Sequence, residues 1–112
     1  MSQITTHILD TSVGKPASGV SATLEYRDDS SWTEIASGVT DVDGRIGNLL
    51  KDNQTVDPGV YRLIFNTGDY YEGQAKKCFY PKVVIVFETV DTSHYHVPLL
   101  LNPFGYSTYR GS

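Results

Sequence analysis

The side chains best suited to proton transfer and anion binding are spread over the whole sequence. The three histidines are His7, His94 and His96. An imidazole suits proton transfer near neutral pH because its unperturbed pKa is about 6.5. Arg45 adds a guanidinium, which stays charged and donates paired hydrogen bonds to an anion. An imidazole can deprotonate water, and a guanidinium can stabilise a developing oxyanion.

The ending Tyr109-Arg110-Gly111-Ser112 carries more chemistry than most chain ends. Domains usually finish in frayed polar residues, whereas this one has a guanidinium, a glycine, a hydroxyl and the terminal carboxylate directly after the strand-like residues 105–109. Gly111 can adopt backbone angles closed to other residues, so the ending can turn back toward the histidines. Such a turn would present Arg110 or Ser112 to the histidines.

The elements that must position these groups are short strands. β-Branched and aromatic residues alternate with turn signals at short intervals, which is typical of an antiparallel sandwich. The predicted strands are residues 4–10, 21–27, 33–40, 45–49, 59–66, 82–88, 95–101 and 106–109. One short helix is predicted over residues 67–76, with Thr67 as its N-cap. The expected fold is an all-β, two-sheet antiparallel β-sandwich of about eight strands.

Two of these strands have more apolar residues than we expect for a monomeric sandwich. Residues 83–87, Val-Val-Ile-Val-Phe, are apolar on both faces, although an antiparallel sandwich leaves one face wet. Alternation assigns one face of residues 95–101 to the core: Tyr95, Val97, Leu99 and Leu101. His96 then shares the other face with Pro98 and Leu100, which would be in solvent unless something covers them. Residues 4–10 repeat the pattern, because Leu9 shares the outward face with His7, and the three strands together favour a subunit interface.

The stretches with candidate chemistry resemble the transthyretin-like family, and in particular its 5-hydroxyisourate hydrolase branch. The resemblance runs from His7 to Ser112 and is most specific at the opening HILDTSVGKPA and the ending NPFGYSTYRGS. Ile8 and Asn102 stand where the family pattern has valine and serine, and neither side chain is expected to do chemistry. The resemblance implies a homotetramer with a channel along the His96 face. Two different apolar surfaces in one chain favour a dimer of dimers.

The resemblance also implies an activity and a set of residues. The activity is hydrolysis of 5-hydroxyisourate to 2-oxo-4-hydroxy-4-carboxy-5-ureidoimidazoline during urate degradation, by histidine-activated water and without a cofactor. The residues implied for catalysis are His7, Arg45, His96 and Ser112, and those for substrate binding are His7, Arg45, His96, Tyr109 and Arg110. Which histidine is the base stays open, and His94 receives no role.

The sequence also contains residue types that are used in metal sites and by nucleophilic enzymes. His94 and His96 point the same way on a strand, and His7 could complete a three-histidine zinc site. No carboxylate stands at a spacing that would support such ligands, so we expect no metal. A serine nucleophile is not expected because the sequence has no Gly-x-Ser-x-Gly elbow and Ser112 lies at a flexible end. Cys78 is expected to be a small packing residue, and Asp41 and Asp43 to form a turn.

Composition limits the remaining functions. A chain of 112 residues is expected to form one domain, residues 1–112, and its single cysteine suits a reducing cytoplasm. With a net charge of −4 and no basic cluster, nucleic acid and membrane surfaces are not expected partners. The expected partners are a small-molecule substrate and other copies of the chain. The rival hypotheses are a non-catalytic small-molecule carrier and a structural or adhesion sandwich.

Overall fold

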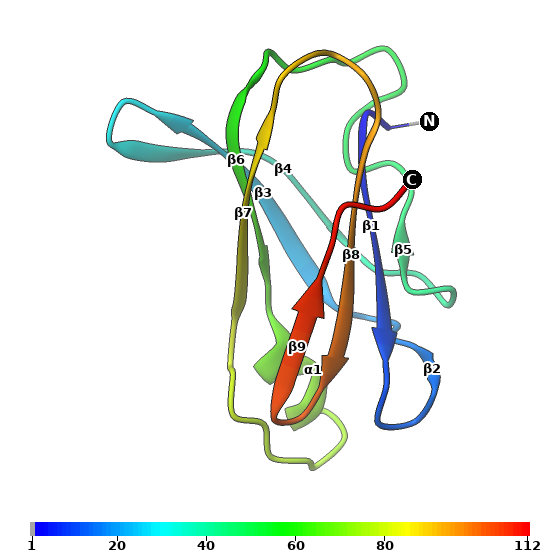
Figure 1. Ribbon diagram of the computed structural model, residues 1–112. Helices are drawn as coiled ribbons and strands as arrows, with labels where there is room; N and C mark the ends of the chain where they lie inside the picture. The colour runs from blue at the N-terminus through cyan, green and yellow to red at the C-terminus, as the bar shows by residue number, and fades with distance from the viewer. Residues whose placement is uncertain (1) are drawn as a thin grey trace.

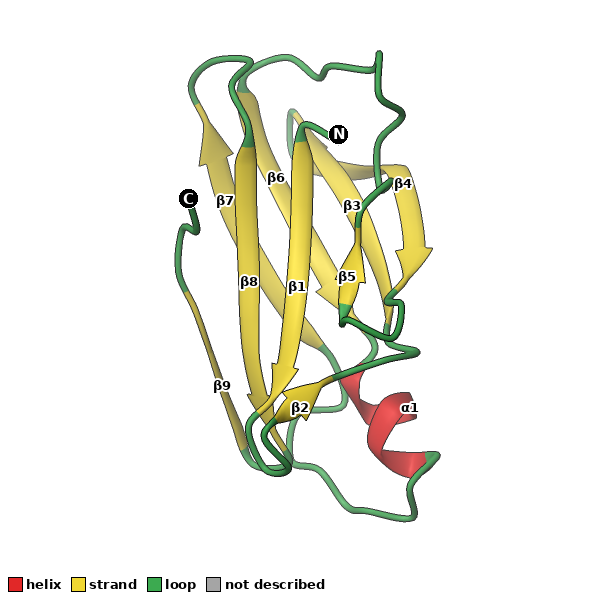
Figure 2. Ribbon diagram, turned by 90° about the vertical axis from the view of Figure 1, so that its right-hand side faces the viewer, coloured by secondary structure: helices red, strands yellow, loops and turns green. Residues whose placement is uncertain are grey.

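Strands with alternating burial build two sheets that face each other, as the computed structural model of residues 2–112 shows (Figure 1). The described strands are β1 (Ile4–Asp10), β2 (Lys15–Pro16), β3 (Ser21–Asp28), β4 (Ser31–Val39), β5 (Arg45–Ile46), β6 (Gly59–Phe65), β7 (Val83–Thr89), β8 (Tyr95–Asn102) and β9 (Gly105–Thr108). One sheet has the order β2-β1-β8-β9, with β5 paired to β1, and the other has the order β4-β3-β6-β7. Figure 2 shows β5 running beside β1 at the edge of the first sheet. The predicted sandwich is confirmed.

The sheet that carries the histidines departs from the expected pattern in one pairing. β1 and β8 are parallel, with Ile4 opposite Tyr95 and Asp10 opposite Leu101. Parallel neighbours need a long connection between them, and here the second sheet and the helix supply it. The strand predicted over residues 45–49 is also shorter, because β5 ends at Ile46. The two-residue strand β2 was not predicted.

The helix α1 (Thr67–Glu72) is shorter than predicted and begins differently. Asn66 occupies the N-cap position, and its side chain makes no capping hydrogen bond. The expected cap at Thr67 is wrong, since its hydroxyl donates to the carbonyl oxygen of Tyr80 at 2.7 Å. The loop before β7 therefore returns over the first turn and competes for this side chain. No helix among the described residues is long and apolar enough to cross a membrane.

The core lies between the sheets and contains the face that alternation predicted for β8. Tyr95, Val97, Leu99 and Leu101 are all buried there. Pro98, on the opposite face, is also buried. The chain's own ending lies against it, because a Cβ added to Gly111 would be 3.3 Å from Pro98 Cγ. Part of the cover expected from a neighbouring subunit is thus supplied within the chain.

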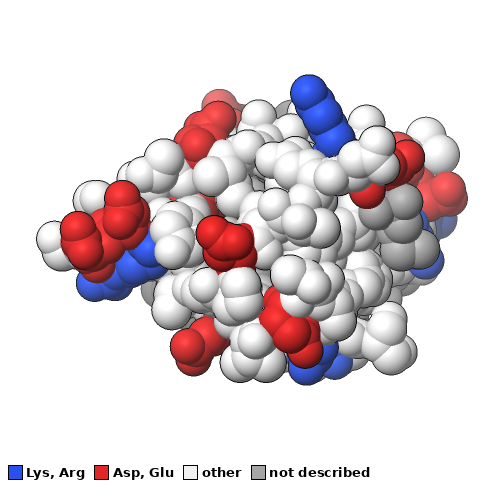
Figure 3. All heavy atoms as spheres, turned by 90° about the horizontal axis from the view of Figure 1, so that it is seen from above, with Lys and Arg blue, Asp and Glu red and all other residues white. Residues whose placement is uncertain are grey.

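The surface carries scattered charged side chains and an apolar edge strand (Figure 3). Over the end of the sandwich seen in Figure 3, acidic and basic groups are interspersed and form no continuous patch of one sign. Strand β7 is the last strand of its sheet, and its outward side chains Val84 and Val86 are 43% and 57% exposed. Both faces of this edge strand are therefore apolar, as its sequence predicted.

Candidate active site

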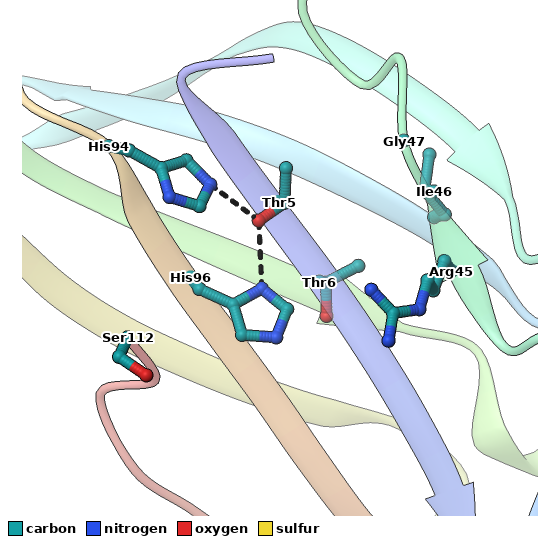
Figure 4. Close-up of a pocket in the computed structure, with 8 residues that line it drawn as sticks. All are labelled: Thr5, Thr6, Arg45, Ile46, Gly47, His94, His96 and Ser112. Atoms are coloured by element: carbon teal, nitrogen blue, oxygen red, sulfur yellow. Dashed lines mark hydrogen bonds between the residues drawn. The ribbon is translucent and has the colours of Figure 1, made fainter. Parts of the chain in front are cut away.

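A cleft of about 280 Å³ opens on the outer face of the sheet formed by β5, β1 and β8 (Figure 4). Its lining residues are Thr5, Thr6, Arg45, Ile46, Gly47, His94, His96 and Ser112. Three of the residues expected in catalysis, Arg45, His96 and Ser112, therefore meet in one place. They come from a short edge strand, a central strand and the ending of the chain.

Strand register brings the polar groups to one side of the sheet. On β1, Thr5 lies opposite His96 of β8, and His7 lies opposite Pro98. His7 is also the cross-strand partner of Arg45 on β5. Side chains two residues apart on a strand share a face, so His7 stands beside the cleft on the face of Thr5. The structure thus brings His7, Arg45 and His96 into one neighbourhood.

A tight turn places Arg45 at the edge of this sheet. The Asp41 carboxylate accepts hydrogen bonds from the backbone N–H groups of Asp43 at 2.9 Å and Arg45 at 3.0 Å. Gly44 has a φ of +75°, and a Cβ there would collide with the carbonyl oxygen of Ile8. The sequence Asp-x-Asp-Gly therefore supplies both the turn and the close approach to β1. The role of Asp41 as a turn former is confirmed.

The centre of the cleft holds two imidazoles joined through one hydroxyl. Thr5 Oγ1 lies 2.8 Å from His96 Nδ1 and 2.9 Å from His94 Nε2 (Figure 4). The two rings are nearly parallel, with centroids 6.3 Å apart. His94 is exposed at the rim, whereas His96 is half-buried. Sequence reasoning missed Thr5 and gave His94 no role, although Thr5 shares a strand face with His7 by simple alternation.

The surroundings of His96 favour its uncharged form. Burial is the largest cause that lowers the pKa of His96 below its usual value of 6.5, and electrostatic interactions with the neighbouring His94, His7 and Arg45 lower it further. Each of these effects disfavours the imidazolium. His96 is therefore neutral near pH 7 and has a lone pair available to accept a proton.

The ending of the chain is bonded to β8 beside this imidazole. The backbone N–H of Gly111 donates to the carbonyl oxygen of His96 at 2.9 Å. A Cβ at Gly111 would lie 2.5 Å from His96 Cδ2, so only glycine lets the two strands approach this closely. The expected reason, an unusual backbone angle, is wrong: the glycines with positive φ in the described chain are Gly14, Gly19 and Gly44. Ser112 reaches the cleft as expected.

Tyr109 and Arg110 lie around a different opening. They line a second pocket of about 240 Å³, between β7 and β8, to which His96 also contributes. The Arg110 guanidinium stacks over the ring of Tyr95 at 4.4 Å from its centroid. These two residues thus flank His96 from the side opposite to the cleft, and within one chain the structure does not bring them to Arg45.

The geometry defines no cluster of metal ligands. Across residues 2–112, no group of three or more histidine, cysteine, aspartate or glutamate side chains is arranged to hold an ion. One ring nitrogen of His94 and one of His96 are instead within hydrogen-bond distance of the Thr5 hydroxyl. The arrangement instead offers a neutral imidazole, a guanidinium and a hydroxyl around a small cleft. Such groups can activate water and hold an anion.

The fold is thus a two-sheet β-sandwich with imidazole and guanidinium groups on one outer face. The chain belongs to the HIUase/Transthyretin family, whose model matches residues 4–111. The 5-hydroxyisourate hydrolase of Salmonella dublin is 48% identical over 110 residues, which covers 97% of this chain and 80% of that protein.

Two solved structures show what the fold alone can support. Sea bream transthyretin in complex with thyroxine has a TM-score of 0.90 and 36% identity, over 98% of this chain and 95% of that one. The 5-hydroxyisourate hydrolase of Klebsiella pneumoniae has a TM-score of 0.85 and 34% identity, over 97% and 92% of the two chains. A thyroxine-bound protein and a hydrolase thus share this backbone, so function depends on the side chains of the site.

Proposed function

We propose that this chain hydrolyses 5-hydroxyisourate to 2-oxo-4-hydroxy-4-carboxy-5-ureidoimidazoline in urate degradation. The observation that carries this proposal is the neutral, half-buried His96 in the same cleft as the Arg45 guanidinium. A general base and a fixed cation are what hydrolysis of an amide-like ring needs. Relatives that carry the name 5-hydroxyisourate hydrolase over nearly the whole chain supply the substrate.

The reaction follows from these two groups. Water adds to the amide-like carbonyl of the six-membered ring: a C–O bond forms, and one water proton passes to Nε2 of His96. Arg45 donates hydrogen bonds to the oxyanion that develops on the carbonyl oxygen. The ring C–N bond then breaks, and His96 returns its proton to the leaving nitrogen. The product carboxylic acid ionises near neutral pH.

The other expected residues orient the water and bind the substrate. His7, the cross-strand partner of Arg45, orients the water and the guanidinium. Ser112 contributes its hydroxyl at the cleft. Tyr109 and Arg110 bind substrate from the second pocket, on the other side of His96. No metal or other cofactor takes part in this scheme.

The active form is a homotetramer, a dimer of dimers in the cytoplasm. Support comes from the exposed Val84 and Val86 on the edge strand β7, where a second copy can pair and cover them. The half-buried Leu9 and Leu100 on the His96 face offer a second surface. If each surface pairs with its own copy across a two-fold axis, the two surfaces together close a set of four copies. Light scattering at micromolar concentration measures the mass, and a monomer would contradict this assembly.

An absorbance assay tests the activity directly. Urate oxidase converts urate to fresh 5-hydroxyisourate, whose decay is followed with and without the protein. The decay should be much faster with wild-type protein, and His96→Ala at the same concentration should remove most of the acceleration. No acceleration by the wild-type protein would reject the hydrolase. In that case, binding of thyroxine would favour the carrier, which the likeness to thyroxine-bound transthyretin suggests.

A further inference from the structure

The hydroxyl of Thr5 lies between two imidazoles and cannot donate a hydrogen bond to both of them. Its oxygen is within hydrogen-bond distance of His96 Nδ1 and His94 Nε2, at 2.8 and 2.9 Å. A threonine hydroxyl has one proton to donate and lone pairs to accept. When it donates to one imidazole, it accepts a hydrogen bond from the other. The three side chains therefore form a directed chain, and its direction decides which nitrogen of His96 carries the proton.

Arg45 sets that direction. The Nε2 side of the His96 ring faces the guanidinium of Arg45 across the cleft (Figure 4). A guanidinium has only donors, so an N–H of His96 on this side would meet other donors. A bare Nε2 lone pair is the compatible state. Neutral His96 then carries its proton on Nδ1 and donates a hydrogen bond from Nδ1–H to the Thr5 oxygen. The Thr5 hydroxyl in turn donates a hydrogen bond to His94 Nε2.

We propose that Thr5 and His94 are positioning residues that hold His96 in the Nδ1–H form, with Nε2 bare toward the substrate. His94 accepts the single proton of Thr5, and Thr5 can then only accept from His96. This inference rests on the proposed general-base hydrolysis and adds two residues to which neither the resemblance nor the composition gave a role. Thr5 and His94 act through His96.

The arrangement matters because a neutral imidazole accepts a proton at only one nitrogen. If the Thr5 proton turned toward His96, His96 would carry its own proton on Nε2 and could not deprotonate water. A carboxylate that fixes the catalytic histidine has the same task in serine hydrolases. Here a hydroxyl, itself fixed by an exposed histidine, has that task without placing a negative charge beside the base.

Four single variants separate this role from a structural one. Thr5→Val removes the hydroxyl while keeping the shape and the strand preference of the side chain, and Thr5→Ser keeps the hydroxyl. His94→Ala removes the acceptor, and His94→Gln restores one in its amide oxygen. Thr5→Val and His94→Ala should each lower kcat about 3- to 10-fold, the population ratio that one hydrogen bond sustains. KM should change little, and Thr5→Ser and His94→Gln should stay near wild type.

The double variant and a spectroscopic measurement complete the test. Thr5→Val combined with His94→Ala should be no slower than Thr5→Val alone, because both break the same chain. Full additivity would overturn the proposal. Nitrogen-15 spectra of the imidazoles should show a protonated Nδ1 and a bare Nε2 for His96 in the wild type, and a mixture in Thr5→Val. A wild-type His96 protonated on Nε2, or spectra unchanged by Thr5→Val, would also overturn it.

These spectra are recorded on the wild-type protein and on Thr5→Val without substrate. If the nitrogen-15 result is as expected but 5-hydroxyisourate is not hydrolysed, the proposed function fails and the arrangement of the three side chains stands. If hydrolysis is found and the His96 spectrum does not respond to Thr5→Val, only the inference about Thr5 and His94 fails. Circular dichroism of each variant confirms that the sandwich is folded.

Discussion

Gly111→Ala changes the contact between the chain's ending and the proposed base by a single methyl group. The added Cβ would lie 2.5 Å from His96 Cδ2, 3.2 Å from His96 Cγ and 3.3 Å from Pro98 Cγ. Carbon atoms prefer separations of about 3.5–4.0 Å, so a shift of about 1 Å is required. The imidazole is held by Thr5 on its other side, and Pro98 is buried. We expect the ending to lift from β8 or His96 to turn.

Either movement should reduce turnover much more than stability. A displacement of about 1 Å near the reacting atoms lowers the rate about 10²-fold. The fold loses mainly the hydrogen bond from Gly111 to His96, worth about 1 kcal/mol. For a chain of this size, that corresponds to a fall in Tm of about 4 °C. The ratio of these two effects, a large kinetic loss with a small thermal shift, is the quantity to measure.

The assay compares hydrolysis of fresh 5-hydroxyisourate and thermal melting for wild type, Gly111→Ala and Gly105→Ala. Gly105 is a matched control on β9, since a Cβ there would meet nothing closer than 3.7 Å, an ordinary contact. Gly105→Ala should retain its activity. If Gly111→Ala also retains full turnover, the contact with His96 has no part in catalysis, and the reasoning from close approach is refuted.

Four other changes test the site. Alanine at His7 or His96 should lower kcat about 10²–10⁴-fold with little change in Tm, and equal losses of rate and stability would contradict this. Because the pKa of His96 is lowered, kcat/KM should stay high as the pH falls through 6.5. It should drop only at lower pH, where the imidazole gains a proton and can no longer act as a base. A drop centred above pH 6.5 would exclude His96 as the base. Deleting residues 110–112 should abolish most activity and preserve the oligomer mass, whereas full activity in the truncated oligomer would remove the ending from the mechanism. Activity should survive dialysis against a strong chelator, and a loss that zinc restores would reverse this assignment.

The fold was accessible from sequence because alternation and turn residues are local signals. The period-two pattern of β8 separates its buried face from the face with His96, and every strand longer than two residues was predicted within one or two residues of its ends. The turn at Asp41 and Gly44 was equally readable. The helix cap was not, because the hydroxyl of Thr67 has a competing partner in Tyr80, distant along the chain. Capping preferences depend only on residues near the helix end. They do not account for a loop that folds back over the helix and accepts a hydrogen bond from the capping side chain.

The sequence by itself determined which residue types are available and which strand face each one shares. It placed His7 and His96 on outward faces and Arg45 just after a turn, because these properties depend on near neighbours. Only the tertiary structure decided which of these side chains are in contact with one another. The parallel register that sets Thr5 against His96 joins strands some ninety residues apart, and a shift of that register by one residue would send Thr5 to the other face. The same holds for Gly111 against His96, and for Arg110 over the ring of Tyr95. Local patterns choose a face, whereas packing across the whole chain sets the register.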